Sequence, residues 1–75
     1  MTVTVKAVSG PDPVNFVYLE GSIDGHPQVT QTRTIASAAL ASGALTIAAE
    51  KAALIADVET ALTNWQAAQA ALSEL

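Results

Sequence analysis

The single histidine, His26, is the side chain in this sequence best suited to proton transfer or metal binding near neutral pH. It lies in a Gly-His-Pro turn and is preceded by three carboxylates, Asp12, Glu20 and Asp24. These groups would suit a weak metal site, or His26 would serve as the base of a serine triad. Their spacing favours neither arrangement, because carboxylates beside turns more often cap the backbone or remain solvated. We therefore expect no metal site, no cofactor and no enzymatic activity.

A second polar set, Glu50, Asp57 and Asn64, recurs at intervals of seven residues. In a helix this spacing places the three side chains along one flank. Paired carboxylates can perform acid–base catalysis, but these stand two helical turns apart and no pocket-forming partner accompanies them. We interpret the flank as solvated, with Lys51 available to pair charges across an oligomer interface.

The charge distribution argues against nucleic acid as a partner. The chain of 75 residues has a net charge of −4, and its basic residues, Lys6, Arg33 and Lys51, are scattered. Binding to phosphates requires clustered basic side chains. No basic segment precedes an apolar stretch, so no signal peptide is predicted. Charged residues interrupt the apolar C-terminal half, so we expect no transmembrane segment and a cytoplasmic or virion-associated protein.

The small size of the chain makes association with other chains the expected source of additional stability. A domain of this length buries only about 60% of the surface that its unfolded chain exposes. Small domains usually compensate with disulfides, a metal or partner chains. The sequence contains no cysteine and only one histidine. We therefore expect a homo-oligomer or a protein partner within a larger assembly.

The elements that position these residues divide the chain into two halves within a single domain, 1–75. Residues 1–35 hold all three prolines and six of the seven valines, whereas residues 36–75 hold 15 of the 16 alanines. Valine is enriched in strands, and alanine is the best helix former. The sequence thus predicts a β-rich part, 1–35, followed by a helical part, 36–75.

Three strands are predicted in the first half, at Thr2–Val8, Val14–Leu19 and Val29–Ile35. The first and third show a two-residue alternation of side-chain types, and the second is rich in β-branched and aromatic residues. A proline-rich loop, Ser9–Pro13, separates the first two, and turn-forming residues at Gly21–Gly25 separate the last two. The second strand has apolar residues on both faces, which is typical of a central strand. The predicted fold is α+β, with a three-stranded antiparallel meander followed by one long C-terminal alanine-rich helix.

The helical half allows two alternatives around Gly43. Either one helix extends from near Ser37 to Ser73, or a short segment ends at Gly43 and the main helix begins between Ala44 and Thr46. A helix from Thr46 to Ser73 would be about 42 Å long. That length exceeds what a three-stranded sheet can cover, so we expect the remainder to pack on another chain.

An apolar stripe along this helix supplies the candidate interface. Its members recur at helical spacing, and Trp65 is interpreted as a structural anchor. The interface candidates are Leu54, Ile55, Val58, Leu62, Trp65, Gln69 and Leu72. The predicted core consists of Val3, Val5, Phe16, Tyr18, Val29, Leu54, Ile55, Val58, Leu62 and Trp65.

These features predict a non-enzymatic structural subunit that oligomerises or docks on a larger complex through its C-terminal helix and its sheet edges. The cysteine-free composition, rich in alanine, threonine and valine, resembles that of small accessory proteins of tailed-phage particles. That resemblance implies a component of a virion. The alternative is a small binding or regulatory module in which the turn Asp24–Gln28 captures a ligand or a partner peptide.

Overall fold

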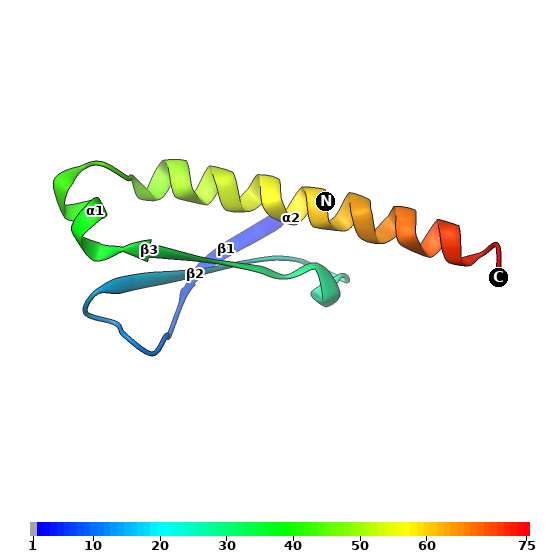
Figure 1. Cartoon of the computed structure of the whole chain (residues 1–75), viewed down its shortest axis with the longest axis horizontal. Helices are drawn as coiled ribbons and strands as arrows, with labels where there is room; N and C mark the ends of the chain where they lie inside the picture. Colours follow the sequence, from blue (N-terminus) through cyan, green and yellow to red (C-terminus); the bar gives the residue numbers. More distant parts are fainter. Residues whose placement is uncertain (1) are drawn as a thin grey trace.

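The computed structural model describes residues 2–75 and has the predicted α+β architecture (Figure 1). Three strands come first, and the long helix α2 lies across them. In chain order the elements are β1 (Val3–Val8), β2 (Phe16–Ile23), the 3-10 turn η1 (Pro27–Val29), β3 (Gln31–Ala36), α1 (Ser37–Ser42) and α2 (Ile47–Leu72).

The sheet is the predicted antiparallel meander, with β2 between β1 and β3. Its turns differ from the prediction in two places. Strand β2 continues through Gly21 to Ile23, so only Asp24 and Gly25 make the tight turn, with Gly25 at φ 82°. Val29, predicted to begin the third strand, instead ends η1, because Pro27 starts this 3-10 turn and delays strand pairing to Gln31.

The helical half is broken at Gly43, as in the second of the two alternatives. Gly43 adopts φ 80° at the end of α1, a left-handed conformation that residues other than glycine rarely adopt. The main helix then begins after Thr46, whose hydroxyl accepts a hydrogen bond of 3.2 Å from the Ala49 N–H. This capping interaction satisfies one of the free N–H groups in the first turn of α2.

The hydrophobic core lies between α2 and one face of the sheet. It is formed by Leu19, Ile23, Val29, Ile35, Leu54, Val58 and Leu62. Four of these side chains were predicted to be buried: Val29, Leu54, Val58 and Leu62. Three further predicted core residues, Val3, Val5 and Trp65, pack against the core while remaining partly exposed. Ile55 is half-buried.

The prediction that Phe16 and Tyr18 belong to the core is wrong. In the register of the sheet, Phe16 is opposite Ala36 and Tyr18 is opposite Thr34, on the face that α2 does not cover. Phe16 is 38% exposed. The alternate residues of β2, including the buried Leu19 and Ile23, face α2 instead. Because both faces of β2 carry apolar side chains, the alternation alone does not indicate which face the helix covers.

The helix packs closely on the sheet at Gly21. A Cβ atom at this position would lie 2.9 Å from Val58 Cγ2 and 3.1 Å from Leu54 Cγ. Both distances are shorter than ordinary van der Waals contact, so any larger residue would push the helix away from the strand. The missing side chain of Gly21 therefore sets the spacing between the two layers.

Replacement of Gly21 by alanine is expected to destabilise the fold by about 1–3 kcal/mol, because the added methyl group overpacks the contact with Leu54 and Val58. Urea unfolding followed by circular dichroism measures this difference. Ser22→Ala is the matched control, since Ser22 lies on the opposite face of the same strand. Equal unfolding midpoints for the two variants would contradict the packing described above.

Candidate functional site

The polar residues singled out in the first half of the chain do not converge in space. Asp12 binds Asn15, Glu20 pairs with Lys6 across the sheet at 3.8 Å, and Asp24 is exposed in its turn. Within residues 2–75, no group of three or more His, Cys, Asp or Glu side chains is placed to hold a metal ion. In the same part of the chain, no helix combines the length and apolar character needed to cross a membrane.

The Asp12 carboxylate organises the loop between β1 and β2. Its oxygens accept hydrogen bonds from the side chain of Asn15, at 3.0 Å, and from the backbone N–H of Asn15, at 3.1 Å. These bonds hold the pKa of Asp12 below its usual value. The Asn15 carbonyl in turn accepts a bond of 2.8 Å from the Ser37 N–H, which ties the loop to the start of α1. The role of Asp12 in this structure is thus to support a turn.

His26 packs against the only tryptophan of the chain. The rings of His26 and Trp65 meet edge to face, with their centroids 5.6 Å apart. Gln28 Nε2 lies 3.5 Å from His26 Nδ1. Because the Asp24–Gln28 turn is fixed against α2 through this pair, the structure gives His26 a packing role.

The interpretation of Glu50 as part of a solvated flank is wrong. Glu50 is buried on the face of α2 that packs on the sheet, where its carboxylate accepts a charge-assisted hydrogen bond from Arg33 Nε on β3. Arg33 also reaches Asp57, with Nη1 3.4 Å from Oδ2. The opposite charges of an arginine on a predicted strand and a glutamate on the predicted helix were a sequence signal for an ion pair. Their 17-residue separation along the chain concealed the contact.

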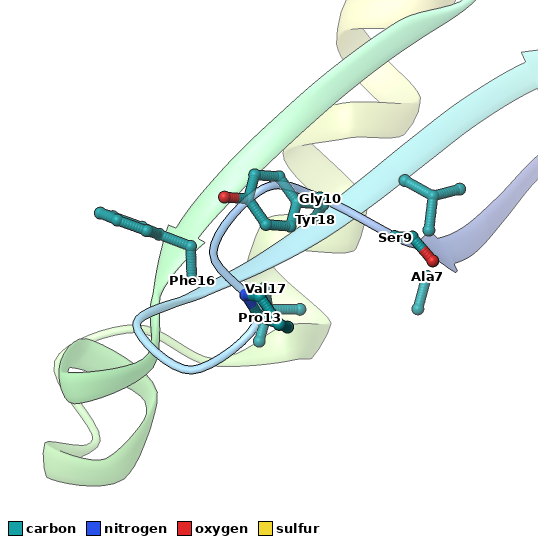
Figure 2. A pocket seen from close by; sticks show the side chains of 8 residues that line it. Ala7, Ser9, Gly10, Pro13, Phe16, Val17 and Tyr18 are labelled. Atoms are coloured by element: carbon teal, nitrogen blue, oxygen red, sulfur yellow. The ribbon is translucent and has the colours of Figure 1, made fainter.

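An open hollow of about 590 Å³ lies beside the loop between β1 and β2, at the end of the sheet (Figure 2). The Tyr18 ring covers Gly10 so closely that no Cβ atom would fit at this position. The Tyr18 hydroxyl accepts a hydrogen bond of 3.2 Å from the Asp12 N–H. Phe16 and Pro13 complete the apolar part of the wall. The hollow therefore offers mainly apolar contact.

The second uncovered surface is the end of α2. The molecule measures 50 × 22 × 18 Å, and α2 continues past the sheet (Figure 1). We call residues 67–75 the overhang; all of them are exposed. Trp65 packs against the core and against His26, and every residue of α2 that follows it is exposed.

The seven interface candidates divide between the two parts of α2. Leu54, Val58 and Leu62 are buried against this chain's own sheet and present no surface to a partner. Ile55 and Trp65 are half-buried. Gln69 and Leu72 lie on the overhang, where Leu72 is 54% exposed. The interface prediction thus concerns chiefly the part of the stripe from Trp65 onwards.

The sheet edges form a third surface. Strands β1 and β3 each pair only with β2, so the outer side of each has no neighbouring strand within residues 2–75. Exposed edges of this kind are able to pair with strands of other chains. Lys6 lies on β1, and a charged residue on an edge strand discourages indiscriminate pairing.

Comparison of the chain with protein-family models, with curated proteins and with solved structures gives no match. A function must therefore come from the surfaces themselves, since a fold alone does not specify one. The surfaces that bear on it are the overhang, the edges of the sheet and its uncovered face.

Removing one partner of the Arg33–Glu50 pair is expected to lower the unfolding free energy. In Arg33→Met the Glu50 carboxylate stays buried without its main partner, and we expect a loss of about 2–3 kcal/mol in unfolding free energy. The double variant Arg33→Met/Glu50→Leu should recover most of that loss, because it removes both charges. Chemical denaturation of the three proteins tests this. Lys6→Met, which breaks an exposed pair, is the control and should cost less than about 1 kcal/mol.

His26→Ala should lower the unfolding free energy by about 0.5–1.5 kcal/mol, because it removes the edge-to-face contact with Trp65. The Trp65 fluorescence should shift to longer wavelength as the indole becomes more hydrated. Gln28→Ala, in the same turn, is the control and should leave the spectrum unchanged. An unaltered spectrum in His26→Ala would show that the turn does not rest on Trp65.

Proposed function

We propose that this chain is a non-enzymatic structural subunit that docks on other chains through the end of α2 and the edges of its sheet. The observation that carries the proposal is the overhang, a length of apolar helix for which the chain's own sheet provides no cover.

The shape of the molecule supports an assembled state. The chain exposes 4944 Å², whereas a compact monomer of 7.6 kDa exposes about 4,300 Å². Its radius of gyration is 14.8 Å, against about 11 Å for a compact domain of this length. An isolated domain gains little stability from an extended shape, because that shape leaves apolar surface in water.

The energetics of a small domain point in the same direction. Within residues 2–75 the core contains seven buried apolar side chains, and the sequence has no cysteine to form a disulfide. Domains of this size gain useful stability when further apolar surface is buried against a partner. Leu72, on the overhang, is a large apolar side chain positioned for such burial.

The non-enzymatic part of the proposal rests on what the chemistry-bearing side chains do. Asp12 closes a turn, Glu20 pairs with Lys6, Glu50 pairs with Arg33, and His26 packs on Trp65. Each of these groups serves the fold. The narrower proposal of a virion-type component rests on composition alone, namely the abundance of alanine, threonine and valine.

The proposal is tested by sedimentation of the protein, alone and mixed with the products of neighbouring genes. We expect a mass above the 7.6 kDa of one chain in at least one of these conditions. Deletion of residues 67–75, which are all exposed, should abolish that association while circular dichroism shows the core retained. Glu59→Gln, an exposed change earlier in α2, is the control. A single-chain mass in every condition would refute the proposal.

A further inference from the structure

We propose that the groove between the start of β1 and α2 receives an extended segment of a partner protein. The segment pairs with the free edge of β1 and places a lysine or arginine side chain beside Glu59. This inference rests on the proposed function, and it names the edge that docks and the chemistry of the partner. The lining of the groove, the strand edge next to it and the charges of the chain support it.

The groove has an apolar wall and a polar rim. Its volume is about 270 Å³, and it is lined by Val3, Ile23, Glu59, Leu62, Thr63 and Gln66. The three apolar side chains belong to the core or pack against it, and the three polar side chains are exposed on α2. Lysine and arginine suit such a surface, because their aliphatic stems lie along apolar groups while the charged end stays in water. The groove therefore offers a site for one long basic side chain, with the Glu59 carboxylate beside its charge.

Glu59 lies on the flank of α2 that faces β1. Asp57 pairs with Arg33 of β3, and Glu59 follows Asp57 by two residues, which is a rotation of about 200° around the helix. The two carboxylates therefore project from opposite flanks, Asp57 toward β3 and Glu59 toward β1. The groove agrees with this placement, because Glu59 and Val3, the first residue of β1, both line it.

Glu59 forms no ion pair within residues 2–75. Lys6 and Arg33 pair with other carboxylates. Lys51, the third basic residue, precedes Glu59 by eight residues, about 12 Å along the helix, which is beyond the reach of an ion pair. The chain as a whole has a net charge of −4. A basic segment would therefore supply the missing positive charge at the groove and would be attracted to the whole molecule.

The edge of β1 suits strand pairing better than the edge of β3. On the side of the sheet that α2 covers, β1 carries the half-buried Val3 and Val5 and the exposed Ala7, an apolar row that an added strand would extend. The corresponding row of β3 contains Arg33, which is already bound to α2, and α1 follows β3 directly. When a strand is added to a sheet, backbone hydrogen bonds provide affinity and a pocket for one side chain provides specificity. The free edge of β1 and the groove beside it combine these two features.

A second copy of this chain does not supply the basic side chain. Its β1 strand would present only apolar residues on the side toward α2, because Lys6 lies on the other side of the sheet, opposite Glu20. The basic residue of its β3 strand is Arg33, which Glu50 of the same chain already binds. Two molecules with a net charge of −4 also repel each other. The charges therefore favour a different protein that has an extended basic segment.

The test uses the isotopically labelled full chain and two short peptides with blocked ends. Both peptides alternate threonine and valine, and a central valine is replaced by lysine in one and by glutamate in the other. NMR titration to about 1 mM peptide should shift the amide signals of β1 and those around Glu59, and leave β3 unchanged. The lysine peptide should bind about threefold to tenfold more tightly than the glutamate peptide, because it gains an exposed ion pair where the other meets a like charge. This difference should shrink in about 1 M salt.

Glu59→Lys reverses the charge at the rim and should invert the preference, so that the glutamate peptide binds more tightly. Glu74→Lys is the matched control, since it makes the same change at another exposed position that does not line the groove, and it should retain the preference for lysine. Circular dichroism should show the same helicity in both variants. Glu59→Gln should abolish the preference while the chain still associates, because backbone pairing supplies affinity and the charge supplies specificity.

The outcomes separate this inference from the proposed function. If neither peptide binds, or if both bind equally tightly, the groove does not receive a basic segment, and the assembly proposal stands wherever sedimentation shows a complex. Shifts confined to β3, or a preference that Glu59→Lys does not invert, would refute the proposed geometry. A doubling of mass of the chain alone that the lysine peptide suppresses would make a second copy the occupant instead. A preference for lysine together with a single-chain mass in every mixture would refute the assembly proposal and leave the peptide site in place.

Discussion

The structure depends on the close contact between α2 and Gly21 of the central strand. Because Gly21 has no side chain, Leu54 and Val58 reach the backbone of β2 and become fully buried. A helix held at this distance covers one face of a three-stranded sheet and leaves the other face to solvent. The core, the exposed position of Phe16 and the direction of the overhang all follow from this one contact.

An ion pair and an aromatic contact mark the ends of the covered part of α2. Near its start, Glu50 of α2 pairs with Arg33 of β3, and farther along, Trp65 meets His26 from the turn after β2. Between them the helix is supported by its own sheet, and beyond Trp65 it is not. The boundary between the folding surface and the candidate docking surface is therefore set by where the sheet ends, because the apolar pattern of the helix continues across it.

Much of the candidate site was predictable from the sequence, because helical spacing is a local property. The stripe that contains Leu62, Trp65 and Leu72 is visible in the printed residues. The same pattern gave no means to tell Leu62, which is buried in its own fold, from Leu72, which is exposed. The uncovered aromatic face was missed, since apolar residues occur on both sides of β2. The Arg33–Glu50 pair was missed, since its partners come from different elements.

The sequence by itself determined the order and type of the elements: valine-rich strands, a proline-rich loop and a long alanine-rich helix, with Gly43 as a candidate break. These are local outcomes of backbone preference, and short stretches of residues carry them. Only the tertiary structure decided which face of the sheet is buried, how a charged residue such as Glu50 is satisfied and where the overhang begins. Those features depend on contacts between residues far apart in the chain, and periodicity within one element does not encode them.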